Sequence, residues 1–326
     1  MKFGSVATEE ALGAVLAHAV PLKKGRLRKG LVLAPDDIAA LLASGHSQVI
    51  VAQYEPGDLN EDDAAAQLAK AIAGKGLRLS QAATGRVNLY ATGPGILQIS
   101  TSSIDAMNAI NPMITAATVP PFQRVSEDGM VATIKIISYA VPGKDVKAAM
   151  DAAQQALSVL PPQFLTATLI ETEISEKPSA KGRQSLAGRL DRLGLTLTPR
   201  VVVPHRACAL ATAVRQAAGE VVFILTASAT SDIADVGPEA VRQAGGEITQ
   251  FGMPVDPGNL LFLGVYNKKP VIGLPGCARS PALNGADWVL ERVICGAHPS
   301  PSNFAKMGVG GLLKEIPTRP KPRADI

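Results

Sequence analysis

The segment Gly273–Pro281, GLPGCARSP, has the composition of an anion-binding turn. It follows the apolar pair Val271 and Ile272, which predicts a strand, and it precedes a pattern typical of a helix. Ser280 is a candidate N-cap, and Pro281 suits the first helical position. Backbone N–H groups at such a helix start would point at a ligand, and the Arg279 guanidinium matches phosphate. The alternative interpretation is an ordinary capped helix start.

A second polar segment, Thr226–Asp232 (TASATSD), also follows an apolar run and precedes Asp235 at an expected helix start. Its small hydroxyl side chains could donate to phosphate oxygens, while Asp232 or Asp235 could hold a hydrated Mg²⁺. The alternative is structural. Ser231 and Asp232 are good N-cap residues, and an acidic residue in a first turn complements the helix dipole.

Two further loops carry side chains that suit a site. His205 follows an expected strand, either as a site residue or as a plain helix cap. The loop after Glu171 carries charged side chains that either clamp an anion or are simply solvated: Glu173, Lys177, Lys181 and Arg183.

The elements that position these residues alternate between strand and helix beyond residue 160. The pattern predicts an α/β domain with a mostly parallel sheet covered on both faces, whose ligands bind beyond the carboxyl ends of the strands. The expected strands and extended stretches are 165–171, 196–203, 221–226, 247–266 and 270–274. The expected helices are 182–193, 206–217, 235–244 and 281–294.

The first half of the chain is more mixed. Helices are expected at 9–17, 35–43, 60–73 and 145–157, with a strand at 47–53 and further strands and turns up to residue 140. Leu160-Pro161-Pro162 predicts a linker, because the residue before a proline is disfavoured in a helix. We therefore expect a smaller mixed α+β region at 1–160, an α/β domain at 163–300 and a C-terminal extension or linker at 301–326.

The composition of the chain argues against several classes of function. The chain has 326 residues, 47% of them hydrophobic, and a net charge of +4, which argues against a purely electrostatic nucleic-acid binder. A basic run at 23–29 is interrupted by glycine and is typical of a solvated turn. Three scattered cysteines, Cys208, Cys277 and Cys295, predict a reduced chain without a zinc site. With no signal peptide or long apolar span, the expectation is a cytoplasmic protein that binds neither membrane nor nucleic acid.

Taken together, these loops resemble the molybdopterin-binding domain of molybdenum-cofactor biosynthesis, the MoaB/Mog type. The first loop resembles its Leu-Pro-Gly-Asn-Pro-x-Ser motif, and the second its Thr-x-Gly-Gly-x-Ser segment with a following Asp. The run 252–276 is similar to the connection that carries Lys-Pro-Gly-Lys-Pro in molybdotransferases. Here Asp256-Pro257-Gly258-Asn259 stands in place of that basic motif. The matching positions are Leu274, Pro275, Gly276 and Ser280 in the first loop, and Thr226, Ser231 and Asp235 in the second.

Weaker likenesses extend to the front region. The stretches 84–89, 108–111 and 130–135 resemble a bacterial subgroup in which a molybdopterin-binding region precedes a nucleotidyltransferase domain. In that subgroup the GCARSP loop and a GVGGLL run, here Gly308–Leu313, come before the transferase. The ending PTRPKPRADI resembles a linker.

The chain also departs from the family. Ser228 and Ala229 replace paired glycines, which adds Cβ atoms where backbone approaches a ligand closely. Cys277 stands where the family has Asn, either as an inert small side chain or as a soft contact to the cofactor. The front region lacks the Asp-Gly-Tyr-Ala motif of molybdotransferases.

The resemblance implies a three-layer Mog-like fold and molybdopterin as the cofactor, with Mg²⁺ and a nucleotide as further candidates. Together with the chemistry of the two loops, it makes Asp232 and Asp235 the candidate catalytic residues, with Asp235 also as metal ligand. The candidate cofactor-binding residues are Thr226, Ala227, Ser228, Ser231, Pro275, Gly276, Cys277, Arg279 and Ser280.

Three functions remain open: a protein that binds molybdopterin or molybdenum cofactor and presents it for modification, a Mg-dependent adenylyl- or molybdotransferase acting alone, and a divergent interaction module without catalysis. The relatives' assembly further implies a homodimer in which Arg86 or Lys135 approaches the cofactor crevice of the partner subunit. The alternative for each of these two side chains is a solvated surface position.

Overall fold

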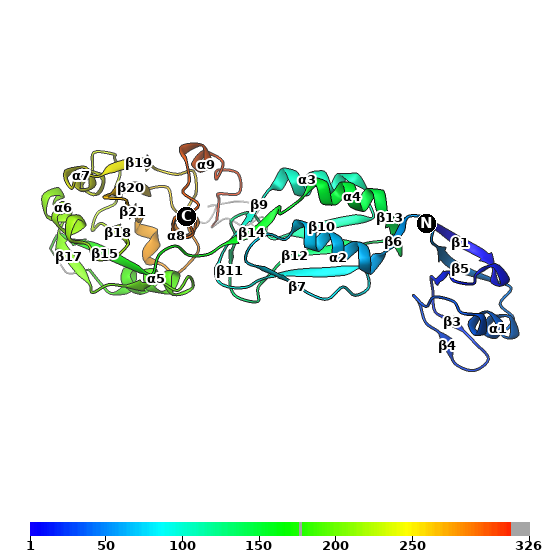
Figure 1. Ribbon diagram of the computed structural model, residues 1–326. Coiled ribbons are helices and arrows are strands. Elements are labelled where there is room, and N and C mark those ends of the chain that lie inside the picture. Colours follow the sequence, from blue (N-terminus) through cyan, green and yellow to red (C-terminus); the bar gives the residue numbers. More distant parts are fainter. Residues whose placement is uncertain (176–177, 314–326) are drawn as a thin grey trace, which may run out of the picture. The chain divides into compact units, whose positions relative to one another are not determined.

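The computed structural model describes residues 1–175 and 178–313 (Figure 1). The chain divides into two compact units. Unit 1 contains residues 1–92, 97–123 and 127–159, and unit 2 contains residues 93–96 and 124–126 together with the described residues from 160 to 313.

The first part of unit 1 is a small sheet with one helix. Its strands β1, β5 and β2 pair antiparallel in the order β1-β5-β2, and β3 pairs with β4 in a separate hairpin. Leu16, Leu33, Leu41 and Val51 form its core. The bounds are β1 Lys2–Ala7, η1 Thr8–Glu10, β2 Val15–Leu16, β3 Val20–Pro21, β4 Arg26–Leu27, α1 Pro35–Ala43 and β5 Gln48–Gln53.

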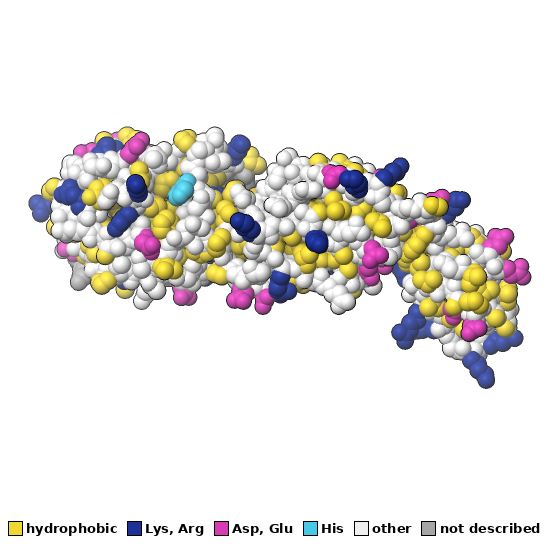
Figure 2. Space-filling view, viewed as in Figure 1, with side chains coloured by type: hydrophobic (Ala, Val, Ile, Leu, Met, Phe, Trp, Pro, Cys, Tyr) yellow, Lys and Arg dark blue, Asp and Glu magenta, His cyan; other side chains and the backbone are white. Residues whose placement is uncertain are grey.

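The basic run at 23–29 lies on the β3–β4 hairpin. All five of its Lys and Arg side chains are exposed, and Figure 2 shows such side chains projecting from this part of the surface. The run is therefore a solvated turn.

The second part of unit 1 is a four-stranded antiparallel sheet in the order β10-β12-β8-β7, packed against helices. Along β8, Val87, Leu89 and Ala91 are buried, whereas the alternating residues reach the other face. Its elements are β6 Asp58–Asn60, α2 Glu61–Ile72, β7 Leu77–Leu79, β8 Arg86–Ala91, α3 Thr101–Ile110, β10 Ile114–Thr118, β12 Met130–Ile136, β13 Ala140–Pro142 and α4 Gly143–Ala152.

Arg86 and Lys135 both have partners within unit 1. Arg86 donates to the Thr133 hydroxyl over 3.3 Å, and the Lys135 ammonium donates to the carbonyl of Thr84 and lies 4.0 Å from Glu61. Three more strands, β9 Gly95–Ile99, β11 Arg124–Val125 and β14 Leu157–Leu160, form a sheet in the order β11-β9-β14.

Unit 2 is an α/β structure built on a seven-stranded sheet. Strands β15, β18 and β21 are parallel neighbours, β16 and β17 both pair parallel with β15, and β20 and β19 continue antiparallel beyond β21 (Figure 1). The strand bounds are β15 Thr166–Glu173, β16 Thr196–Leu197, β17 Val201–Pro204, β18 Val221–Leu225, β19 Glu247–Phe251, β20 Phe262–Tyr266 and β21 Lys269–Gly273.

Helices α6 and α7 pack on one face of this sheet, where Ile170, Ile224 and Val271 join their apolar side chains. Leu225 points to the opposite face because side chains alternate along a strand. There a Cβ added to Gly182 would lie 2.5 Å from Cδ2 of Leu225, so glycine lets α5 begin against this side chain without displacing it. The helices are α5 Lys181–Asp191, α6 Ala207–Gln216, α7 Val236–Gln243, η2 Gly276–Arg279, α8 Gly285–Ile294 and α9 Pro301–Ala305.

Residues 301–313 pack within unit 2. Phe304 and Met307 are buried, and Leu312 makes a parallel bridge to Asp256. The expected linker PTRPKPRADI and Lys177 lie outside the described residues.

Three of the expected elements were wrong. The predicted helix at 9–17 is a short 3₁₀ turn followed by β2, because Gly13 has a φ of +75° and turns the chain. The predicted helix at 145–157 ends at Ala152, and Gln155 has a φ of +49° before β14 begins. The predicted strand at 196–203 is divided into β16 and β17.

Candidate functional site

The carboxyl ends of the neighbouring parallel strands β18 and β21 bring the two predicted loops together. The loop 226–235 follows β18, and the loop 274–280 follows β21, the next strand of the sheet. The Arg279 guanidinium donates to the carbonyl of Thr226 over 2.7 Å and joins the two loops directly. Residues some 50 positions apart therefore lie side by side at the carboxyl edge of the sheet, and we call this pair of loops, 226–235 and 274–280, the strand-end crevice.

The loop 226–235 is held by its own hydrogen bonds. The Thr226 hydroxyl donates to the carbonyl of Ser228 over 2.7 Å and lies 3.2 Å from the Thr230 hydroxyl. Ala227, Ser228 and Ser231 are exposed. Neither Ser228 nor Ala229 has a positive φ, so the loss of the family's glycines imposes no backbone strain.

Asp232 and Asp235 act as local caps. Asp235 is the N-cap of α7, and its two carboxylate oxygens accept from the N–H groups of Val236 (2.7 Å) and Ser231 (3.0 Å). Asp232 accepts from the N–H of Ala234 over 2.7 Å. Across residues 1–175 and 178–313, no group of three or more His, Cys, Asp or Glu side chains could hold a metal ion.

The loop 274–280 does not begin a helix, so the predicted cap at Ser280 was wrong. Gly276–Arg279 forms a 3₁₀ turn, and α8 begins only at Gly285. Asn284 is its N-cap and accepts from the N–H of Ala286, while Asp287 accepts from the N–H of Asn284. This reciprocal capping fixes the helix start four residues later than expected.

Arg189 explains why the chain stays outside a helix here. This α5 residue is 3% exposed, and its guanidinium donates to the Asp287 carboxylate over 2.7 Å. It also donates to the carbonyls of Ala278, Ser280 and Ala282 over 2.8–3.0 Å. One buried side chain therefore shapes the whole turn, which we call the Arg189 clamp.

Backbone donors without a partner in the protein remain at the strand-end crevice, on residues that are exposed to solvent. Among the described residues, the backbone N–H groups of Ser228, Ala229 and Gly276 donate no hydrogen bond. Pro275 is buried and Cys277 is half-buried beside them. Backbone N–H groups next to an arginine form a site suited to an anion.

Thr172 and His205 extend the crevice toward β15 and β17. The Thr172 hydroxyl accepts from the N–H of Ala227 over 2.7 Å and lies 2.9 Å from Nδ1 of His205. The sequence pointed to the end of this strand without singling out Thr172. Since its neighbour Glu171 pairs with Arg200 at 2.7 Å, that carboxylate is neutralised within the fold.

Comparisons with known proteins give limited matches. A model described as a domain of unknown function (DUF8806) matches residues 5–53. No curated protein matches the chain.

The part of the chain described by the structure contains no helix long and apolar enough to span a bilayer.

Solved structures similar to this chain come from molybdopterin biosynthesis. The MoeA protein of Pyrococcus horikosii is 16% identical, with a TM-score of 0.33, over 94% of this chain and 77% of that one. A molybdenum cofactor biosynthesis protein of Pyrococcus furiosus is 13% identical, with a TM-score of 0.25, over 94% and 65%. A MoeA structure from Pyrococcus horikoshii OT3 is 11% identical, with a TM-score of 0.28, over 93% and 76%. These TM-scores are too low to define this chain's fold or function.

Proposed function

We propose that unit 2 binds molybdopterin, or the molybdenum cofactor made from it, in the strand-end crevice and presents it for modification during cofactor biosynthesis. The observation that carries this proposal is the meeting of two loops at the ends of β18 and β21, joined by Arg279. Both loops carry the residues that resemble the molybdopterin-binding family. The proposal includes the three-layer Mog-like arrangement of unit 2.

The chemistry of the crevice fits the parts of molybdopterin. A terminal phosphate would accept from the Arg279 guanidinium and from the N–H groups of Gly276, Ser228 and Ala229. The exposed side chains of 227–231 are small, which leaves room for a flat ring system and adds the Ser228 and Ser231 hydroxyls as hydrogen-bonding groups.

We propose binding rather than catalysis by these residues. Both carboxylate oxygens of Asp235 already accept backbone N–H groups, and Asp232 accepts from Ala234. A Mg²⁺ ion at Asp235 would have to compete with the cap of α7. The proposal therefore assigns no nucleotide-transfer step to either residue.

Replacing Arg279 by alanine should weaken molybdopterin binding by roughly 1.5–3 kcal/mol, the range for a hydrogen bond to a charged group. Arg279→Lys should recover part of this loss, since it keeps the charge without the planar fork. A titration of the purified protein would measure both effects. Arg192→Ala, at an exposed position directly after α5, should bind as the wild type does.

Dephosphorylated molybdopterin separates a phosphate contact from a structural role. If Arg279 binds phosphate, the dephosphorylated ligand should bind the wild type and Arg279→Ala equally. If Arg279 acts only by holding Thr226, both ligands should lose affinity by the same factor. Unchanged affinity of the intact ligand would remove Arg279 from the site.

A further inference from the structure

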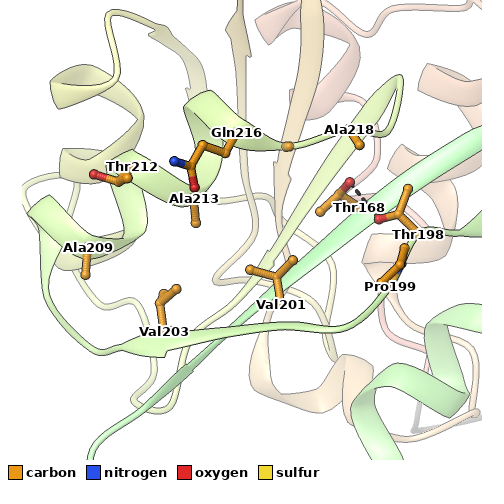
Figure 3. A pocket seen from close by; sticks show the side chains of 11 residues that line it. Thr168, Thr198, Pro199, Val201, Val203, Ala209, Thr212, Ala213, Gln216 and Ala218 are labelled. Carbon is orange, nitrogen blue, oxygen red and sulfur yellow. Dashed lines mark hydrogen bonds between the residues drawn. The ribbon is translucent and has the colours of Figure 1, made fainter.

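A pocket of about 360 Å³ opens between strand β17 and helix α6, on the sheet face that α6 covers (Figure 3). Val201 and Val203 of β17 form one wall, and Ala209 and Ala213 of α6 form the opposite wall. None of the residues assigned to the strand-end crevice lines it. The pocket opens to solvent, since Pro199, Thr212, Gln216 and Ala218 of its lining are exposed, and a ligand could enter it without a change of the fold.

Polar groups meet the apolar walls at two points. Thr168 and Thr198 lie at one end, with their hydroxyl oxygens 2.9 Å apart, and the N–H of Gly219 donates to the Thr168 hydroxyl over 2.9 Å. Gln216 lies across the pocket, and Figure 3 shows its amide extending toward Ala213 over the space above the two valines. The amide of Gln216 makes no hydrogen bond with any other residue that the structure describes.

The lining and the size restrict the ligand class. No charged side chain lines the pocket, so its walls offer no ion-pair partner to a charged ligand group and favour an uncharged one. An enclosed apolar cavity of about 150 Å³ accommodates benzene. At about 360 Å³ this open pocket has room for a fused two-ring system. An unpaired amide, with its donor and acceptor side by side, matches a heterocyclic edge that offers the complementary pair.

We propose that this pocket binds an uncharged, fused two-ring heteroaromatic group, with the Gln216 amide bonded to the ring edge and the Val and Ala walls against the ring faces. A purine base and a pterin ring both have this chemistry. The proposal is independent of the strand-end crevice, because the two sites share no residue.

Adenine and pterin, used as separate probes, distinguish these two sources. In protein with ¹³C-labelled Val and Ala methyl groups, we expect saturable NMR shifts at Val201, Val203 and Ala213, with NOEs from these methyls to the ring protons. The probe that binds more tightly identifies the source. Shifts confined to the crevice loops, or no shifts at millimolar probe, would overturn the proposal.

Two variants test the pocket itself. Ala209→Leu fills the pocket from the α6 wall and should weaken binding of the tighter probe at least tenfold. The control is Cys208→Leu, which enlarges the side chain at the preceding position, exposed and outside the lining, and should leave the affinity for the probe unchanged. Gln216→Leu, at an exposed position that does not threaten folding, should weaken the probe roughly threefold to tenfold. Wild-type affinity in both Ala209→Leu and Gln216→Leu would refute this assignment.

Discussion

Replacing Arg189 by alanine should lower the free energy of unfolding of unit 2 by roughly 3–5 kcal/mol, because it leaves a buried carboxylate without its partner. The Arg189 and Asp287 side chains are 2% and 7% exposed. Three carbonyl groups of the turn 278–282 would also lose their donor. Urea unfolding followed by Trp288, the chain's one tryptophan, would measure the loss within unit 2.

Arg192→Ala provides the matched control for the Arg189 clamp. Arg192 follows α5 on the surface and donates to the carbonyl of Gly188, so its loss should change stability by no more than about 0.5 kcal/mol. Arg189→Lys should remain strongly destabilised, since an ammonium cannot reproduce the fixed fork. A loss below about 1 kcal/mol in Arg189→Ala would show that the turn is held by other contacts.

The second large effect concerns pH. Burial raises the pKa of Glu291 from 4.5 to about 7, although Arg124 lies 3.1 Å away and opposes the shift. The folded state therefore holds this proton more tightly than the unfolded state does. The Glu291 contribution is fully present below pH 4.5 and is lost as the pH rises toward 7. Between pH 5 and pH 8 the loss amounts to about 2.5 kcal/mol.

Glu291→Gln isolates this contribution, because the amide remains neutral at every pH. Relative to the wild type, we expect this variant to gain about 2.5 kcal/mol on going from pH 5 to pH 8, measured by the same Trp288 unfolding curves. Glu239→Gln should not reproduce this gain. Hydrogen bonds from Gln243 and Arg242 lower the pKa of Glu239, so any effect there has the opposite sign. Parallel pH curves for the wild type and Glu291→Gln would contradict the account.

Much of unit 2 could be predicted because its elements follow apolar periodicity. The parallel pairing of β15, β18 and β21 follows from alternating strands and helices, and it places the two loops at one edge. The start of α8 could not be predicted in the same way. Ser280-Pro281 is a good local start signal, but capping by Asn284 and Asp287, together with the carbonyl bonds of Arg189, outweighs it.

Arg189 itself left a signal in the sequence. It shares a helical stripe with Ser185, Leu186 and Leu190, all buried on α5, so its spacing places a charge on the apolar face. A charge in that position requires partners, but its partners lie about 90–98 residues further along the chain. Sequence periodicity does not reveal contacts between residues so far apart in the chain.

The homodimer expected from the sequence stays a prediction.

The most direct test of the central claim is to look for the ligand on the protein itself. The chain, purified from a host that makes molybdopterin and then oxidised, should release a fluorescent pterin derivative in near-stoichiometric amount. Arg279→Ala should release much less, and Arg192→Ala as much as the wild type. Wild-type protein from such a host that releases no pterin would contradict the proposal that the strand-end crevice binds molybdopterin.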